Sequence, residues 1–223
     1  MNNKAYIKEI FDSIQGEGVY IGYKQLFIRF SGCNLKCAYC DTDFITNLKA
    51  YTPQELADEV SKYKNIHSIS LTGGEPLINV QFLKEFIPLS NHKIYLETNG
   101  TLYKNLEEII EYTDIISMDI KLNSTSQNGD LFDIHKKFIE VTKENKKEIF
   151  VKVVFDEKIT DEEINKTVDI VKQFNIPLII QPKSAGEKLN LSTDIINKIF
   201  NLFIEKYSNV RLIPQVHKFL NVR

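Results

Sequence analysis

Short apolar runs alternate with longer segments of helical periodicity along most of this chain. The short runs are rich in Ile, Val, Leu and Phe, as is typical of buried strands, and they cover residues 25–30, 68–72, 93–97, 115–119, 149–155, 178–181 and 210–212. Between them, apolar residues at helical spacing predict helices over residues 53–63, 80–89, 106–112, 161–174 and 192–207. Thr52 and Thr160 precede two of these helices as capping hydroxyls, and Pro53 suits a first helical position.

Repeated strand and helix units predict right-handed crossovers and a parallel sheet. We therefore expect an α/β fold, a partial (βα)6-type barrel with a parallel sheet and outer helices. One domain should span residues 1–223, with residues 1–24 as an N-terminal extension and residues 208–223 as a C-terminal tail. In such barrels the chemistry lies in the loops that follow the strands.

Unusual residues follow five of the predicted strands. They are Cys33, Gly73 with Gly74, Thr98 to Gly100, Lys121, and Pro182 with Lys183. Because the carboxyl ends of parallel strands lie at one edge, we expect these residues on one face of the barrel. Residues 124–129, Ser-Thr-Ser-Gln-Asn-Gly, are predicted to form a flexible surface loop.

Composition limits the function classes. The 223 residues are 43% hydrophobic, which is enough for a substantial core. The net charge of −2 gives no long-range attraction to nucleic acid or to an anionic membrane, so we expect neither partner. The sequence contains no apolar run long enough for a signal peptide or a membrane span, and we expect a cytoplasmic protein.

All three cysteines fall within eight positions, at Cys33, Cys37 and Cys40. This crowding is unlike a disulfide framework, whose paired cysteines are spread along the chain. A structural zinc site normally has four protein ligands, and none of the four histidines stands near the cysteines in sequence. In a four-iron cluster, three thiolates leave one iron open to another ligand. The spacing therefore favours an iron-sulfur cluster over zinc.

The C-x3-C-x2-C spacing, with Tyr39 directly before Cys40, resembles the radical S-adenosylmethionine (SAM) superfamily. The resemblance implies that Cys33, Cys37 and Cys40 hold a [4Fe-4S] cluster whose open iron binds the amino and carboxylate groups of SAM. It also implies reductive cleavage of SAM to methionine and a 5′-deoxyadenosyl radical, which abstracts hydrogen from the substrate.

Several polar residues at predicted strand ends are candidates for SAM contacts. The Thr72-Gly-Gly-Glu-Pro76 stretch resembles the superfamily element that binds the amino group of SAM. Its glycines allow close backbone approach, and the Glu75 carboxylate suits an ammonium group. Glu97, Thr98 and Asn99 end the third predicted strand with a carboxylate, a hydroxyl and an amide that can hydrogen-bond a ribose diol. Ser117, Asp119 and Lys121 share one face of a strand. The alternatives are an ordinary strand-to-helix turn, an Asx turn and simple strand-end polarity. The candidate cofactor residues are Tyr39, Gly74, Glu75, Glu97, Asn99, Ser117, Asp119, Lys121 and Gln181.

The two ends of the sequence hold candidate substrate residues. The candidates in the N-terminal segment are Ile14, Gln15, Gly16 and Glu17, which include the start of a Gly-Glu-Gly turn. We expect the Gln15 and Glu17 side chains to form paired hydrogen bonds to a nitrogen-rich ring edge, because a carboxylate matches the two parallel N–H donors of a guanidine-like edge. The alternative is a glycine-rich turn that binds no ligand. Near the C-terminus, Gln215 and His217 lie two residues apart and so on one side of an extended segment. With Gln15, Glu17 and Arg29, His217 would complete a polar pocket for a small heterocyclic acid, and a packed or solvent-facing histidine is the alternative.

Arg29 has apolar neighbours on both faces of its predicted strand, so we expect its side chain to point into a pocket. An inward arginine requires a carboxylate, from either the protein or a substrate. We favour the substrate.

Five short stretches, spread over nearly the whole chain, together resemble the 7-carboxy-7-deazaguanine synthase family. They are Ser-Ile-Gln-Gly-Glu-Gly, Phe-Ile-Arg-Phe-Ser-Gly-Cys, Cys-Asp-Thr, Thr-Gly-Gly-Glu-Pro and Pro-Gln-Val-His-Lys. The resemblance implies conversion of 6-carboxy-5,6,7,8-tetrahydropterin to 7-carboxy-7-deazaguanine with loss of ammonia, on the route to queuosine and related deazapurines. It also implies that SAM is regenerated in each turnover and that Mg²⁺ assists.

By the same resemblance, Thr72 joins the substrate residues and Thr42 is a ligand of Mg²⁺, which prefers oxygen. The resemblance further implies a homodimer that receives electrons from flavodoxin or ferredoxin. Family members often end in a proline that contacts the substrate, and Asn221-Val-Arg223 departs from that pattern. Family members also differ in the sequence of the strand that here contains Ser117 to Lys121, so the resemblance does not specify which SAM contacts this strand makes.

Two other functions stay open. A glycyl-radical enzyme activase shares the cysteine spacing, but such activases tend to carry Asp-Gly-Pro-Gly where this chain has Gln15-Gly-Glu-Gly18. A non-catalytic iron-sulfur or zinc-binding module would normally complete its metal site with protein ligands.

Overall fold

Seven parallel strands form the main part of one nine-stranded sheet with the order β11-β8-β7-β6-β5-β4-β2-β1-β3. The computed structural model describes residues 3–40, 46–185, 188–189 and 191–222. The parallel strands are β2 (Lys24–Phe30), β4 (Ser68–Gly73), β5 (Ile94–Thr98), β6 (Ile115–Ile120), β7 (Glu148–Phe155), β8 (Leu178–Pro182) and β11 (Val210–Leu212). Each corresponds to a strand that the sequence predicts.

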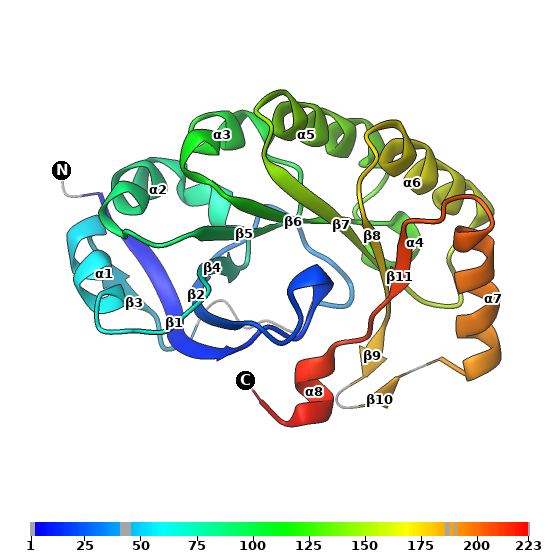
Figure 1. Cartoon of the computed structure of the whole chain (residues 1–223), viewed down its shortest axis with the longest axis horizontal. Helices are drawn as coiled ribbons and strands as arrows, with labels where there is room; N and C mark the ends of the chain where they lie inside the picture. Colours follow the sequence, from blue (N-terminus) through cyan, green and yellow to red (C-terminus); the bar gives the residue numbers. More distant parts are fainter. Residues whose placement is uncertain (1–2, 41–45, 186–187, 190, 223) are drawn as a thin grey trace.

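The sheet curves into an open, partial barrel with helices along its outer face (Figure 1). The longer helices are α1 (Pro53–Val60), α2 (Val80–Phe86), α5 (Phe132–Glu144), α6 (Asp161–Gln173) and α7 (Thr193–Ile204), with the shorter α3 (Tyr103–Glu107) between α2 and α5. Thr52 and Thr160 each form a capping box, because Glu55 and Glu163 return hydrogen bonds to the cap residues. The predicted α/β partial barrel is confirmed.

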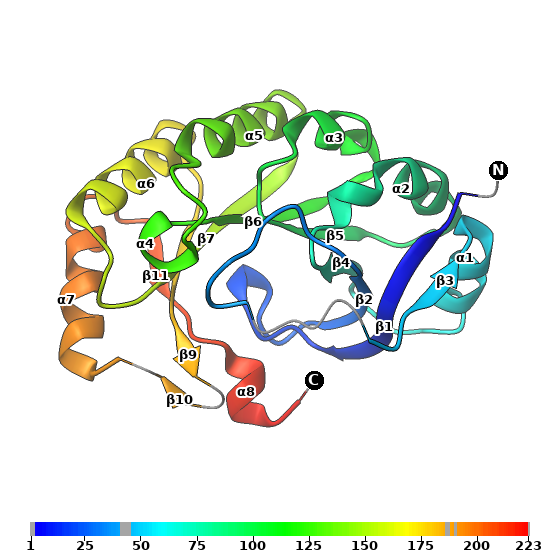
Figure 2. The same ribbon diagram turned by 180° about the vertical axis from the view of Figure 1, so that it is seen from behind.

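Shorter elements lie mainly in the connections (Figure 2). The single-turn helices are η1 (Gly18–Tyr20), η2 (Pro76–Asn79), η3 (Ile87–Leu89), η4 (Ile110–Tyr112), α4 (Asn123–Ser126) and α8 (Val216–Leu220). Strands β9 (Ser184–Ala185) and β10 (Lys188–Leu189) form a separate two-stranded sheet. No helix in the described ranges has the length and apolarity needed to cross a membrane.

Several elements differ from the sequence prediction. Strands β1 (Ala5–Ile14) and β3 (Lys49–Tyr51) add an antiparallel edge, and a register shift in β1 interrupts its apolar alternation. Helix α5 was not predicted because its buried face includes His135 and Thr142, which interrupt the apolar periodicity. The helix predicted over residues 106–112 is divided between α3 and η4.

A small apolar cluster fills the barrel interior at the amino ends of the strands. It consists of Tyr95, Ile115, Phe150 and Ile179, with Val19, Tyr20 and Ile213 packed against them. The segment after β1, drawn in blue, lies inside the arc of the sheet (Figure 1). Tyr20 is held there by its hydroxyl, which donates to Glu148 at 2.6 Å. The N-terminal segment thus closes one end of the interior and leaves the carboxyl ends of the strands open to ligands.

Gly18 allows this segment to enter the barrel. Its φ is +70°, and a Cβ there would lie 2.4 Å from the Phe150 ring. We expect Gly18→Ala to lower the free energy of unfolding more than Gly22→Ala, because Gly22 (φ +90°) has open space around it. The backbone cost at Gly22 should be about 1 kcal/mol, and overpacking at Gly18 should add about 1 to 3 kcal/mol. Urea unfolding measures both, and equal losses would contradict the packing argument.

Candidate active site

Two cavities adjoin at the carboxyl ends of the parallel strands. The larger, of about 230 Å³, is lined by all three cysteines and by residues from several strand ends, including Gly74, Asn99, Lys121, Gln181 and Lys183. The smaller, of about 190 Å³, is lined mainly by the N-terminal and C-terminal segments, including Gln15, Gly16 and His217, and also by Arg29 of β2. Glu17, Thr72, Glu97 and Gln215 line both. The strand-end residues therefore share one face, as the sequence predicts.

The cysteine segment is supported by the Gly73-Gly74-Glu75 turn. Gly74 donates its N–H to Phe30 O at 3.1 Å, and Glu75 N donates to Gly32 O at 2.9 Å. A Cβ on Gly74 would lie 1.7 Å from Gly32 O, so only glycine permits this approach. Cys33 and Cys37 are half-buried and Cys40 is exposed, and all three thiols are free. Thr42 lies outside the described residues.

Glu75 is not among the residues that line the larger cavity, so the structure does not support the expected contact between its carboxylate and an ammonium group. Its side chain is fully buried and accepts hydrogen bonds from Leu77 N, Thr98 Oγ1 and Asn99 N. Burial raises the pKa of Glu75 to about 7, although these hydrogen bonds act to lower it. Glu75 therefore organises the loop after β5.

Asn99 lines the larger cavity, but its side chain is bound to the protein. Its amide donates to Asn34 Oδ1 at 2.9 Å and lies 3.8 Å from Cys33 Sγ, while its carbonyl accepts from Thr101. The hydrogen bond expected between this side chain and a ribose is therefore not supported. Asn99 connects the β5 loop to the cysteine segment.

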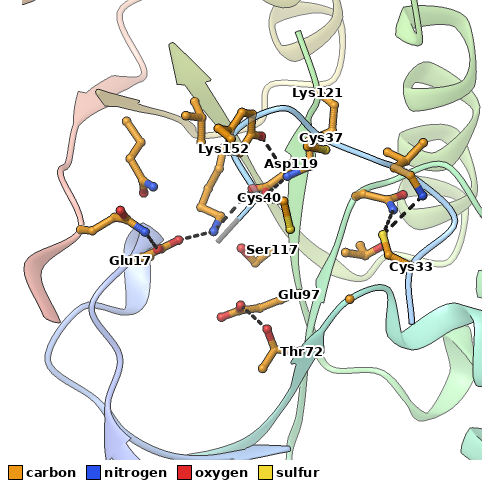
Figure 3. A pocket seen from close by; sticks show the side chains of 18 of the residues that line it. Glu17, Cys33, Cys37, Cys40, Thr72, Glu97, Ser117, Asp119, Lys121 and Lys152 are labelled. Atoms are coloured by element: carbon orange, nitrogen blue, oxygen red, sulfur yellow. Dashed lines mark hydrogen bonds and ion pairs between the residues drawn. The ribbon is translucent and has the colours of Figure 1, made fainter. Parts of the chain in front are cut away.

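Two buried polar atoms in the larger cavity mark a place for a polar ligand. Ser117 Oγ and Gln181 Oε1 have no hydrogen-bond partner within the part of the chain that the structure describes. Buried polar atoms are normally hydrogen-bonded, so these two indicate a missing partner. Ser117 points into the space between Glu17 and the cysteines, beside Glu97 (Figure 3). This cavity therefore fits a polar cofactor next to the three thiols.

A buried charge network connects the two cavities (Figure 3). Lys152 Nζ donates to Glu17 Oε2 at 2.5 Å and lies 3.4 Å from Asp119 Oδ1. Asp119 Oδ2 accepts from Lys121 Nζ at 2.8 Å, and Lys121 also donates to the Tyr39 hydroxyl at 3.2 Å. The network runs from the N-terminal turn to the residue before Cys40.

Lys152 is a site residue that the sequence analysis missed. Its side chain is 7% exposed, in a strand whose other interior residues are apolar. Burial acts to raise the pKa of Glu17, but the Lys152 charge and hydrogen bonds from Lys152 and Gln215 lower it to about 2. Glu17 is therefore an ionised, oriented carboxylate. A lone lysine inside an apolar strand was the sequence feature that could have revealed this partner.

The N-terminal and C-terminal motifs meet at the smaller cavity, as the sequence predicts. Val216 N donates to Gly16 O at 2.9 Å, and a Cβ on Gly16 would lie 2.5 Å from His217 N. His217 is half-buried, and Ile14 lines the same cavity with a more exposed side chain.

Gln15 uses its side-chain amide within the protein, so the structure does not support the expected pairing of this amide with a ligand. Its side chain is 2% exposed, donates to Gln25 Oε1 and Glu97 Oε1 at 2.9 Å each, and accepts from Glu17 N. Thr72 Oγ1 donates to the other oxygen of Glu97 at 2.8 Å. Gln15 and Thr72 therefore hold Glu97 in place at the boundary of the two cavities.

Arg29 forms an ion pair with a carboxylate of the protein itself. Its Nε donates to Glu9 Oε1 at 2.7 Å, and the two residues are opposite each other in the β1–β2 pair. Both side chains are about one quarter exposed. The expected substrate contact is therefore not supported. The expectation failed because β1, which carries Glu9, was not predicted as a strand.

Comparison with known proteins agrees with this geometry. Residues 27–173 match the radical SAM superfamily. A 7-carboxy-7-deazaguanine synthase from Geobacter sulfurreducens is 38% identical over 97% of both chains, and one from Methanothermobacter thermautotrophicus is 35% identical over 99% of this chain and 98% of the relative. The chain belongs to the 7-carboxy-7-deazaguanine synthase family. Membership of the radical SAM superfamily implies a [4Fe-4S] cluster and SAM.

Solved structures give the same fold for this radical SAM family member. A crystal structure of QueE from Escherichia coli has a TM-score of 0.65 at 18% identity, covering 96% of this chain and 95% of the other. Native anSMEcpe with bound AdoMet has a TM-score of 0.57 at 23% identity, covering 83% of this chain and 61% of the other.

The unpartnered Ser117 hydroxyl gives a test of SAM binding in this synthase family member. We expect Ser117→Ala to weaken SAM binding to the cluster-loaded chain roughly threefold to tenfold, the size of one hydrogen bond. Anaerobic equilibrium dialysis measures the affinity. Ser70→Ala is the matched control, because Ser70 Oγ is also buried and has no hydrogen-bond partner among the described residues, but Ser70 lines neither cavity. Equal affinities for wild type and Ser117→Ala would contradict the placement of SAM.

Proposed function

We propose that this chain converts 6-carboxy-5,6,7,8-tetrahydropterin to 7-carboxy-7-deazaguanine with loss of ammonia, on a route to queuosine or related deazapurines. Two relatives named 7-carboxy-7-deazaguanine synthase match 97% and 99% of this chain. The observation that carries the proposal in the structure is the pair of adjoining cavities, one beside the cysteines and one beside the Glu17 turn. Reduced cluster and SAM, when bound, supply the adenosyl radical that abstracts hydrogen.

Glu17 is the residue proposed to recognise the pterin. A carboxylate has about four acceptor positions, and Lys152 and Gln215 each engage one oxygen of Glu17. The remaining positions can accept the parallel N–H donors of the pterin edge. Because its pKa is about 2, Glu17 is charged at physiological pH and binds as an acceptor. The held carboxylate orients the ring without needing to move.

The larger cavity is proposed to hold SAM between the cysteines and the pterin. Cys33, Cys37 and Cys40 are proposed as the cluster ligands. Glu97, Ser117, Asp119 and Gln181 line the same cavity and are proposed to contact SAM. Below them, the apolar cluster around Phe150 and Tyr20 excludes water from the barrel interior. Exclusion of water prevents side reactions of a radical.

Further features are proposed from the family resemblance. Mg²⁺ is proposed to assist, with Thr42 as an oxygen ligand. A flavodoxin or ferredoxin is proposed as electron donor, and the enzyme is proposed to act as a cytoplasmic homodimer. Free thiols in the described chain are compatible with a reducing compartment.

The direct test is an anaerobic assay of the reconstituted full chain. With dithionite, SAM and 6-carboxy-5,6,7,8-tetrahydropterin, we expect 7-carboxy-7-deazaguanine by mass spectrometry, and none from a Cys37→Ala variant. Formation of 5′-deoxyadenosine only in the presence of a glycyl-radical enzyme would instead identify an activase.

The Lys152–Glu17 pair predicts a pH effect. In wild type, the low pKa of Glu17 keeps it ionised, so this group should not reduce kcat/KM between pH 8 and 5. In Lys152→Met, burial is no longer offset by the ammonium group and the pKa of Glu17 rises. Since a carboxylate gains its proton as pH falls, kcat/KM should then decrease toward pH 5. At pH 8 we expect a loss of about tenfold or more.

Two further variants control for this effect. Lys152→Arg keeps the charge and should restore most of the wild-type profile. Lys183→Met removes another lysine of the same cavity, but one that pairs with Asp156 rather than Glu17. In this variant kcat/KM should not decrease between pH 8 and 5. A wild-type profile for Lys152→Met would show that Glu17 does not depend on this partner.

A further inference from the structure

The loop that follows β6 packs against the cysteine segment. Ala38 N donates to Ser126 O at 3.0 Å, and Lys36 N donates to Asn128 Oδ1 at 3.1 Å. Asn128 Nδ2 donates to Cys37 Sγ at 3.2 Å. The sequence predicted a flexible surface loop over residues 124–129, and this prediction is wrong. Instead, the loop accepts hydrogen bonds from the backbone of Lys36 and Ala38, two residues between Cys33 and Cys40.

Local hydrogen bonds hold Asn128 in this position. Gln127, the C-cap residue of helix α4, lies in the left-handed region with φ 60°, and Gly129 N donates back to Asn123 Oδ1 at 2.8 Å. Thr125 Oγ1 donates to Val154 O at 3.1 Å, which connects the loop to the end of β7. In the ribbon, α4 lies on the same face as the segment that follows β2 (Figure 2). Asn128 is therefore presented from a well-anchored turn.

The two ends of the Asn128 amide act differently. The carbonyl accepts the Lys36 N–H and so fixes the backbone between Cys33 and Cys37. The amide donates toward the sulfur of Cys37. A donor near a cluster thiolate stabilises negative charge, and the reduced cluster carries one more negative charge than the oxidised cluster. Hydrogen bonds to the sulfurs therefore raise the reduction potential.

We propose that Asn128 is a positioning residue for the [4Fe-4S] cluster. Its carbonyl docks the cysteine segment, and its amide raises the cluster's reduction potential through Cys37. The proposal depends on membership of the radical SAM superfamily and not on the pterin substrate, so failure of the pterin assay would leave it intact.

Asn128 is a stronger candidate for this function than Asn99. The Asn99 amide lies 3.8 Å from Cys33 Sγ and donates to Asn34 Oδ1 at a much shorter distance. Asn128 is closer to its sulfur, at 3.2 Å. Its side chain also accepts the Lys36 N–H inside the cysteine segment. Asn128 therefore both docks this segment and donates a hydrogen bond to a cluster cysteine.

The test compares two substitutions of Asn128 in the reconstituted full chain. Asn128→Asp keeps the acceptor for Lys36 N–H, loses the donor to Cys37 and adds a negative charge. Asn128→Ala loses both contacts. Ser124→Ala is the matched control in the same loop, because Ser124 Oγ has no hydrogen-bond partner among the described residues. The midpoint of the one-electron couple, from the 2+ to the 1+ cluster, is measured by mediated dithionite titration followed by electron paramagnetic resonance.

We expect a lower midpoint in Asn128→Ala, a still lower one in Asn128→Asp, and no shift in Ser124→Ala. Because the signal comes from the loaded fraction, the midpoint decides the donor role even if iron content falls. A midpoint in both Asn128 variants equal to or above wild type would overturn that role.

Hydrogen exchange tests the docking role separately. In the cluster-loaded chain, amides of residues 36–38 should exchange faster in Asn128→Ala than in wild type, while Asn128→Asp should keep wild-type protection. Equal protection in wild type and Asn128→Ala would overturn the docking role.

Discussion

The buried Lys152 lies between the carboxylates of Glu17 and Asp119, and this arrangement determines how the two cavities meet. A buried ammonium group that loses its partner costs several kcal/mol, roughly 3 to 5 for a broken pair. The N-terminal turn must therefore stay where Glu17 reaches β7. That position in turn depends on Gly18 against Phe150 and on Gly16 against His217. The N-terminal turn, the barrel strand and the C-terminal segment thus form one interdependent unit.

Much of the barrel could be predicted because its determinants are local. Apolar runs mark the parallel strands, and the threonine caps of α1 and α6 are visible in short stretches of sequence. Strand β1 was missed because a register shift between Ile7 and Glu9 breaks its alternation. The error extended to Arg29, whose partner Glu9 lies on that strand. A site residue can be assigned correctly only when its neighbours in the sheet are known.

The candidate site, like the fold, could be predicted only in part from the sequence. Residue types at strand ends predicted which loops gather around the cavities, but not which atoms remain free for ligands. Glu75, Asn99 and Gln15 are polar residues in the expected places, and each uses its side chain within the protein. By contrast, Ser117 Oγ and Gln181 Oε1 have no hydrogen-bond partner in the part of the chain that the structure describes. Only three-dimensional contacts distinguish these two groups.

The central claim is that Lys152 holds Glu17 as a charged acceptor between a SAM site and a pterin site. A crystal structure of the full chain with its cluster, SAM and the carboxytetrahydropterin, obtained without oxygen, tests it most directly. We expect SAM against Ser117 and Gln181, the N–H edge of the pterin on Glu17, and Lys152 still between Glu17 and Asp119. A pterin bound away from Glu17, or Glu17 turned away from Lys152 in the complex, would contradict the claim.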